Sequence, residues 1–210
     1  IFSIIIVIII EKDVENEKTD ITIQKDSLRE KLDSISHEYL SLIDLSYDSK
    51  QNRLFEMKVV ELLTKECGYK GLHLGGTRKP DGIIYTTDLE NNYGVIIDTK
   101  AYSKGYDLPI SQVDEMTRYV EDNNKRDKTR NSNEWWKNFG DDVDEFYFTF
   151  ISGKFKGNIE EKLNRIALAT NRSGAAIAII SLIKLVNELK AERIDLSEVR
   201  QIFINKIYDL

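Results

Sequence analysis

The chain has 210 residues, 41% of them hydrophobic and 31% charged, which is enough to build the core of one domain with an appended arm. Its net charge of −6 argues against tight generic binding to nucleic acid, because such binding comes from lysine and arginine side chains on phosphates. The single cysteine, Cys67, excludes an internal disulfide and a cysteine-rich zinc site and suits a reducing cytoplasm, and two histidines are too few for a histidine-based metal motif.

The first 20 residues divide into an apolar stretch, 1–10, and a polar linker, 11–20. Such a stretch is too short to cross a bilayer, which takes about 20 residues, and neither a basic region nor a small-residue cleavage site marks a signal peptide. It can be the end of a truncated membrane segment, a buried strand or an artefact of the chain boundary, and we expect no functional role and no membrane partner. We predict one folded domain over residues 21–210.

Three helices are predicted before the first strand. Apolar residues spaced three or four apart from about Ile23 indicate an amphipathic helix, and Ser36 is placed to cap a short second one. A third helix over residues 52–67 ends before Gly68. Glu56 lies on this third helix, where an acid packed behind a metal site can be a further ligand or hold a water. A solvated glutamate on the helix face is an equally good interpretation.

Strands alternate with helices through the rest of the chain. A short strand over residues 69–74 precedes two extended segments, Gly82–Thr86 and Tyr93–Lys100. The next helix runs from about Ile110 to Glu121, and its expected buried stripe is Ile110, Val113, Met116 or Thr117, and Val120.

The last third of the chain continues the alternation. Trp135 and Trp136 lie in a long polar connection, and we expect them to anchor it on the core rather than to stack on bases. Strands are predicted over 146–152 and 174–180, and helices over 158–170, 181–193 and 196–204. This order indicates an α/β fold with a central mixed sheet flanked by helices.

The two extended segments place charged residues together. Asp98 and Lys100 point to one face of their strand and Thr99 to the other, since side chains alternate along a strand. Asp81 comes directly after Pro80 and directly before the first extended segment, Gly82–Thr86. Two carboxylates brought together attract a divalent cation, and an ammonium beside them can serve a water or a phosphate. The pattern therefore predicts metal-assisted cleavage of a phosphodiester.

Basic residues flank this pattern beside glycines. They are Arg78, Lys79, Lys154 and Lys156, which can clamp phosphates or simply occupy turns. Asp114 and Arg118 are four apart on the helix after Pro109. They can form an intrahelical ion pair, or pair with their counterparts across a two-fold axis. The residues alone favour the intrahelical pair.

An ordered set of motifs resembles the cleavage domain of FokI-type type IIS restriction endonucleases, within the nucleases with a Pro-Asp…(Asp/Glu)-x-Lys pattern. Outside the Asp81–Lys100 region, the motifs are His37-Glu-Tyr, Glu56-Met-Lys-Val, Leu108-Pro-Ile, Asp114-Glu-Met-x-Arg-Tyr-Val, Asn133-Glu-Trp-Trp and Ser152-Gly-x-Phe-Lys-Gly-Asn. The resemblance covers roughly residues 27–198, so the first 20 residues and the last ten lie outside it.

The resemblance implies roles for these residues and a restriction-endonuclease-like core. Asp81 and Asp98, with the carbonyl of Thr99, would bind Mg²⁺, for which Mn²⁺ would substitute, and Lys100 would complete the catalytic triad. Asp114 and Arg118 would pair across a transient homodimer. The four basic residues named above become DNA backbone contacts.

The resemblance also implies an activity, which is sequence-non-specific cleavage of double-stranded DNA by a cytoplasmic nuclease domain. Its targeting would come from a DNA-recognition module outside this chain. The alternative is a catalytically silent domain of the same fold that binds DNA or protein, and the intact triad counts against it.

Overall fold

The computed structural model describes residues 20–88, 91–204 and 207–208. The apolar stretch at residues 1–10 lies outside the described residues. Before the sheet begins, the chain is helical over 20–29 and then forms the helices that cover one face of the sheet. None of the helices in the described ranges combines the length and the apolar character that a membrane span requires.

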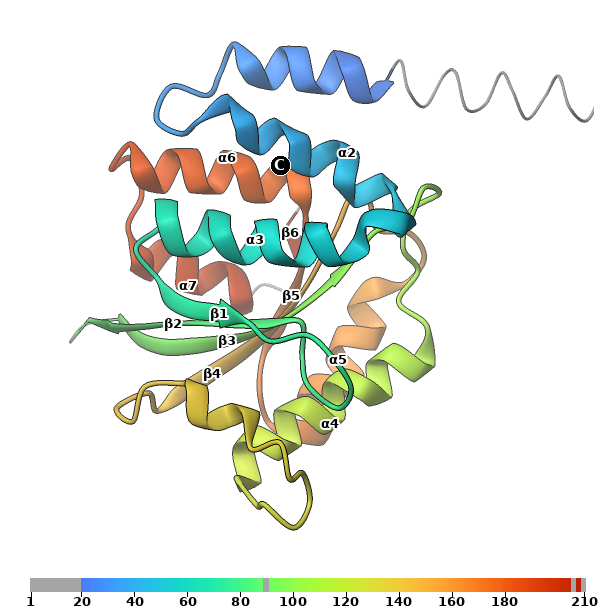
Figure 1. Cartoon of the computed structure of the whole chain (residues 1–210), viewed down its shortest axis with the longest axis vertical. Helices are drawn as coiled ribbons and strands as arrows, with labels where there is room; N and C mark the ends of the chain where they lie inside the picture. The colour runs from blue at the N-terminus through green and yellow to red at the C-terminus, as the bar shows by residue number, and fades with distance from the viewer. Residues whose placement is uncertain (1–19, 89–90, 205–206, 209–210) are drawn as a thin grey trace, which may run out of the picture.

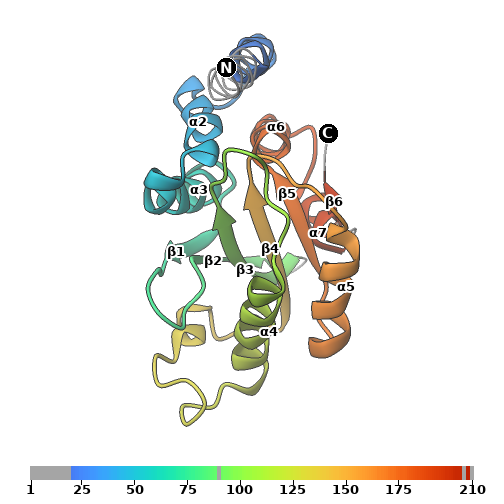
Figure 2. The same cartoon turned by 90° about the vertical axis from the view of Figure 1, so that its right-hand side faces the viewer.

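The described strands form a mixed six-stranded sheet whose spatial order follows the order of the chain (Figure 2). The strands are β1 (Lys70–His73), β2 (Gly82–Asp88), β3 (Asn91–Lys100), β4 (Glu145–Ser152), β5 (Gly174–Ala178) and β6 (Ile207–Tyr208). The first three form an antiparallel meander, and β3 to β6 pair in parallel. The mixed sheet predicted from the sequence is confirmed.

Helices cover both faces of this sheet (Figure 1). They are the 3-10 helices η1 (His37–Leu40), η2 (Ser49–Gln51) and η3 (Trp135–Asn138), and the α-helices α2 (Ser41–Tyr47), α3 (Asn52–Glu66), α4 (Ile110–Lys125), α5 (Ile159–Thr170), α6 (Ile179–Lys190) and α7 (Leu196–Ile204). Local signals set several ends. The Ser36 hydroxyl accepts from the backbone of Glu38 and Asn158 caps α5, while Gly68 follows α3 with a left-handed φ of 73°.

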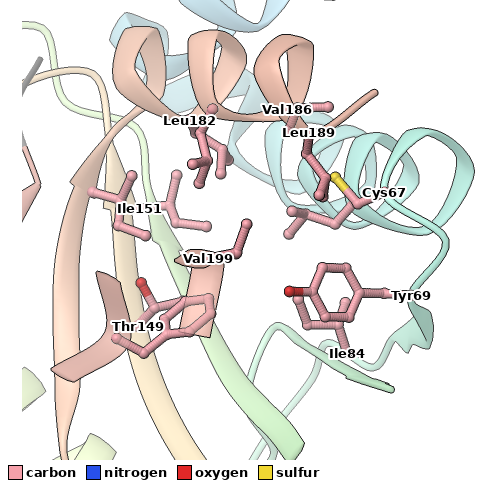
Figure 3. A pocket seen from close by; sticks show the side chains of 13 residues that line it. Cys67, Tyr69, Ile84, Thr149, Ile151, Leu182, Val186, Leu189 and Val199 are labelled. Carbon is pink, nitrogen blue, oxygen red and sulfur yellow. The ribbon is translucent and has the colours of Figure 1, made fainter. Parts of the chain in front are cut away.

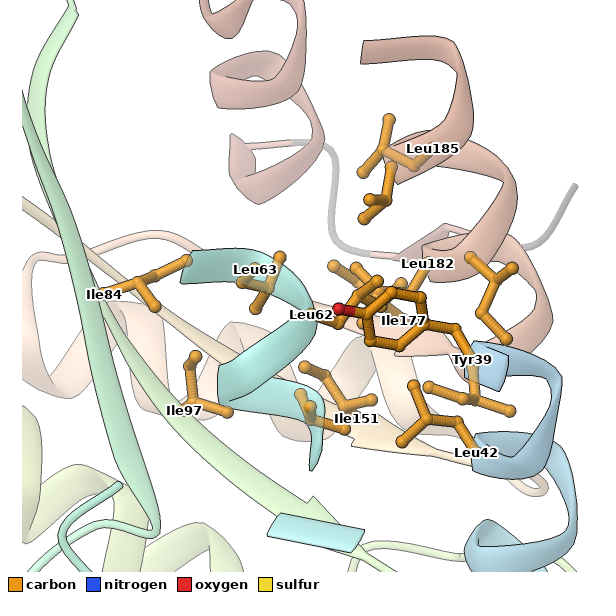
Figure 4. Close-up of a cluster of buried hydrophobic side chains, with 14 of the residues drawn as sticks. Tyr39, Leu42, Leu62, Leu63, Ile84, Ile97, Ile151, Ile177, Leu182 and Leu185 are labelled. Carbon is orange, nitrogen blue, oxygen red and sulfur yellow. The ribbon is translucent and has the colours of Figure 1, made fainter. Parts of the chain in front are cut away.

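Alternation along the strands separates two apolar cores. Ile84 and Ile97 point toward α2, α3, α6 and α7 (Figure 4), whereas Ile83 and Ile96 point toward α4 and α5. A strand that is buried on both faces reads as a continuous apolar run, as β3 does. The middle of the sheet is therefore covered on both faces, whereas the edge strand β1 stays partly exposed.

The first core contains a narrow apolar void between the sheet and helices α3, α6 and α7 (Figure 3). Cys67 and Tyr69 border it among aliphatic side chains. Burial raises the pKa of the Cys67 thiol to about 12, so this cysteine is unreactive at neutral pH. The void is a feature of packing, without the convergent polar groups of a substrate site.

The burial predicted for the tryptophan pair and for most of the α4 stripe is confirmed, but the burial predicted for Ile110 is wrong. Trp135 and Trp136 are 1% and 3% exposed, so the tryptophan pair anchors its loop on the core. The stripe of α4 is buried at Val113, Met116 and Val120, but Ile110 is 48% exposed. Ile110 is the first residue of a helix that runs to Lys125, and α4 meets the core only from its second turn onward.

Candidate active site

The register of β2 and β3 brings the two predicted acids opposite each other. Gly82 pairs with Ile97, and the residues just beyond this pair are Asp81 and Asp98. The Thr99 amide donates to Oδ2 of Asp81 at 2.7 Å, and the Thr99 hydroxyl lies 3.3 Å from the same oxygen. The carbonyl of Asp81 accepts from the amides of Leu74 and Gly75 at 2.8 and 3.2 Å. Asp81 is thus fixed between β1 and β3.

The glycine after Asp81 is required by close packing. A Cβ on Gly82 would lie 2.6 Å from Cγ2 of Val60 on α3, far inside the normal contact distance. The small residue therefore lets β2 begin directly against the helix, and this contact sets where Asp81 stands.

Substituting Gly82→Ala tests this packing. We expect the variant to lose about 1–3 kcal/mol of unfolding free energy through overpacking, because the added methyl group would meet Val60. Adding Val60→Ala removes the clashing methyl, so the double variant should be more stable than the sum of the two single losses predicts. Thermal and urea unfolding measure this coupling, and strictly additive losses would contradict the account.

Asp98 and Lys100 form a buried ion pair on β3. Asp98 is 5% exposed, and Nζ of Lys100 lies 2.9 Å from its Oδ1 and 2.8 Å from its Oδ2. Burial raises the pKa of Asp98 to about 7, with the charge of Asp81 adding to the rise and Lys100 opposing it. The pKa of Asp81 is also raised, by burial and by the charge of Glu56. Burial lowers the pKa of Lys100, but the charges of Asp98, Asp81 and Glu115 together outweigh burial, and the net shift is upward.

This donor set fits a hard divalent cation that keeps water ligands. No three His, Cys, Asp or Glu side chains gather as a metal cage anywhere in the described ranges. Mg²⁺ does not need such a cage, because it binds through one or two carboxylates together with waters and substrate phosphates. Oδ2 of Asp98 is buried and receives no hydrogen bond of good geometry, although Lys100 is close. It is an acceptor suited to a cation.

Glu56 lies behind Asp81 with both carboxylate oxygens engaged. Asn52 donates to Oε1 at 2.6 Å, and Nε2 of His73 lies 3.0 Å from Oε2. Asn52 also accepts from the Ala101 amide at 3.1 Å, which ties α3 to the end of β3. His73 is partly buried. Its contact with Glu56 has no signal in the sequence, since the two residues belong to separate elements.

The predicted DNA contacts lie on two loops. Arg78 is exposed and donates to the carbonyl of Arg130 at 2.6 Å, whereas Lys79 is partly buried. Lys154 and Lys156 are exposed just beyond the end of β4, where Ser152 pairs with Lys100. Both lysines therefore stand at the same end of the sheet as the Asp98–Lys100 pair.

The predicted intrahelical pair on α4 is wrong. Asp114 contacts Arg165 of α5 at 3.5 Å, and both side chains are more than half exposed, at 51% and 58%. Arg118 is exposed and forms no ion pair within the described residues. The packing of α5 beside α4 offers Asp114 a different partner, which local spacing could not reveal.

Three further polar residues on α4 face the site and were missed from the sequence. Gln112, Glu115 and Tyr119 are joined by hydrogen bonds, and the charge of Glu115 raises the pKa of both Asp98 and Lys100. Their spacing of three and four residues was a usable signal for a shared helix face.

Sequence comparison finds similarity to known restriction enzymes over most of the chain. The family model of the FokI cleavage domain matches residues 18–208, which extends the resemblance to both ends of the domain. The type II restriction enzyme FokI of Planomicrobium okeanokoites is 50% identical over 188 residues, covering 90% of this chain and 32% of that enzyme. The type II restriction enzyme StsI of Streptococcus sanguinis is 36% identical over 196 residues, covering 91% and 32%.

Solved structures agree as well. Two structures of the restriction endonuclease FokI, one of them bound to DNA, superpose with a TM-score of 0.88 at 48% identity, covering 90% of this chain and 34% of the FokI chain. The chain thus spans about a third of the length of the curated relatives that it matches. Membership of such a nuclease family implies a divalent metal cofactor in general. The chain belongs to the FokI cleavage-domain family.

Proposed function

We propose that this chain is a Mg²⁺-dependent DNA endonuclease domain that hydrolyses phosphodiester bonds without reading the base sequence. The observation that carries the proposal is the convergence of Asp81, Asp98 and Lys100 at the end of β3, with two acids and one ammonium buried together. This arrangement opposes a catalytically silent role, because a buried charged cluster costs free energy that binding alone does not require.

The residues divide the chemistry between them. Asp81 and Asp98, with the Thr99 carbonyl, would hold Mg²⁺, and Mn²⁺ would substitute. A cation held there would supply polarisation of the phosphate and a lower pKa for a water beside it. Lys100 would orient the attacking water or offset the charge that grows on the phosphoryl oxygens. The water oxygen would bond to phosphorus as the P–O bond to one ester oxygen breaks. The attacking water would give up a proton and the leaving oxygen would take one up, which leaves a phosphate monoester and a hydroxyl. Glu56, with both oxygens already engaged, would act through its charge on Asp81.

DNA would reach the site along the basic loops. Lys154 and Lys156 stand at the same end of the sheet as Lys100, and Arg78 and Lys79 lie on the loop that leads to Asp81. These side chains suit phosphates rather than bases, which supports cleavage without sequence readout. The net charge of −6 limits their affinity, so a recognition module outside this chain would supply targeting.

A double-strand break would require two chains. Each chain carries one triad, and the outer surfaces of α4 and α5 are suited to self-association. This surface presents Asp114 and Arg118 of α4, and Arg165 and Leu168 of α5. Asp114 contacts Arg165, and the Leu168 side chain is 87% exposed. An exposed leucine on a surface with charges of both signs fits a weak two-fold contact, and we propose a transient homodimer through it.

Removal of the metal tests the function directly. Plasmid DNA incubated with micromolar protein should be nicked and linearised with Mg²⁺ or Mn²⁺, and left intact when EDTA removes the cation. Gel electrophoresis of the supercoiled, nicked and linear forms measures the result. Cleavage that persists in EDTA, or its absence with every divalent cation, would contradict the proposal.

A further inference from the structure

Helix α4 covers the face of the sheet on which Asp98 and Lys100 lie. Ile96 packs in one cluster with Val113 and Met116 of α4. Asp98 and Lys100 follow Ile96 at intervals of two residues, so their side chains leave β3 on the same face. The inner surface of α4 is therefore the neighbour of the Asp98–Lys100 pair, and any charged group on that surface acts on it.

Glu115 is such a group, and its orientation is fixed. Gln112 donates to its Oε2 and the Tyr119 hydroxyl to its Oε1, both at 2.9 Å. Tyr119 is 5% exposed, and Glu115 itself is partly buried. A carboxylate held by two donors beside a buried strand keeps its charge in one place. That charge acts on both Asp98 and Lys100, whose pKa values it raises.

Two cations would share the two carboxylate oxygens of Asp98: the ammonium of Lys100 and the proposed metal ion. Nζ of Lys100 lies within 2.9 Å of both oxygens, and the proposed metal site needs at least one. An ammonium and a divalent cation on one carboxylate repel each other. Asp98 and Asp81, whose charges act on Lys100, belong to the proposed metal site. The charge of Glu115, which α4 holds on the face of the sheet that Lys100 shares, also acts on Lys100.

We propose that Glu115 is a positioning residue for Lys100, the anion that keeps its ammonium beside the phosphate when Asp98 is engaged with a divalent cation. Gln112 and Tyr119 hold Glu115 in this orientation. The inference rests on the proposed function, because it concerns the same metal site. It adds that Glu115 aids cation binding through Lys100, by drawing the ammonium away from the Asp98 oxygens.

Cation binding, measured without DNA, tests the proposal. Isothermal titration calorimetry with Mn²⁺ compares the wild type, Glu115→Gln, Lys100→Met and the double variant. We expect Glu115→Gln to weaken Mn²⁺ binding by about tenfold when Lys100 is present, as substitutions next to metal ligands commonly do. In the Lys100→Met background the same substitution should weaken binding by no more than about twofold, because the ammonium that competes for Asp98 is gone.

Control variants keep the result interpretable. Glu121→Gln removes the same charge from α4, where Glu121 faces Arg130, and should leave Mn²⁺ affinity unchanged. Tyr119→Phe keeps Glu115 but removes one of its donors, so it should weaken binding less than Glu115→Gln does, and again only while Lys100 is present. If circular dichroism shows that Glu115→Gln does not fold, Tyr119→Phe tests the proposal in its place.

The outcomes separate the two proposals. An effect of Glu115→Gln that is absent, or equal with and without Lys100, overturns the positioning role. Wild-type protein that binds Mn²⁺ no better than Asp98→Asn overturns the metal site itself, and the proposed function with it. Binding that depends on Asp98, together with a Glu115 effect that requires Lys100, supports both.

Discussion

Replacing Asp98 by asparagine should reduce Mg²⁺-dependent cleavage by on the order of 10³-fold or more, because metal catalysis supplies several kcal/mol of transition-state stabilisation. Asparagine keeps the shape of the side chain but removes the charge that would hold the cation. The fold should survive, since Asp81 and Glu115 still act on the buried Lys100 ammonium. Initial rates of plasmid cleavage measure the loss, and circular dichroism confirms the fold.

Asp88→Asn is the matched control. Asp88 is exposed at the far end of β2 from Asp81, so the same change there should leave the rate unaltered. Lys100→Met separates metal binding by the acids from the role of Lys100 in cleavage. The variant should lose cleavage. It should still bind Mn²⁺, because the ammonium that competes for the Asp98 oxygens has been removed. Cleavage retained by either Asp98→Asn or Lys100→Met would refute the site assignment.

Two charge-reversed variants should restore each other's activity when mixed. In a two-fold pair, Asp114 of one chain would face Arg118 of its partner. Asp114→Arg alone would set cations against cations, and Arg118→Asp alone would set acids against acids. Such juxtapositions destabilise association by several kcal/mol, so each variant alone should linearise plasmid at least about tenfold more slowly. The mixture places opposite charges at both contacts and should recover double-strand cleavage.

The contact of Asp114 with Arg165 in this structure does not prevent Asp114 from pairing with Arg118 of a second chain. Its contact with Arg165 is long, at 3.5 Å, and largely exposed, so it contributes little and can be exchanged. Lys125→Glu, a reversal on the same helix beyond the contact surface, is the control and should leave cleavage unchanged. Wild-type cleavage should also rise more steeply than linearly with protein concentration. A mixture that cuts no better than its components would disprove the cross-chain pairing.

The sequence predicted the site where contacts are local. Asp81, Asp98 and Lys100 lie within 20 residues of each other on adjacent strands, and period-two alternation alone puts the last two on one face. The helix cap at Ser36 was equally local. Such features depend on bonds between near neighbours in the chain, which sequence patterns record directly.

Features that depend on how helices pack were not predicted. Glu115 looked like any charged residue of an amphipathic helix, because only the placement of α4 on the sheet turns it toward Lys100. Asp114 found Arg165 for the same reason. His73 and Glu56 meet only because β1 lies against α3. The periodicity of apolar residues in α4 predicted which side of the helix is buried. It could not predict which polar groups of other elements would lie next to that helix.

The antiparallel meander of β1, β2 and β3 has a consequence for how the domain folds. These strands follow one another directly in sequence, so short loop closures are enough to bring Asp81 opposite Asp98. The parallel partners β4 and β5 must instead return across helices α4 and α5, and such non-local pairing is slower. The topology favours early assembly of the two acids during folding, whereas the basic loop after β4 and the inner face of α4 complete the proposed catalytic centre later.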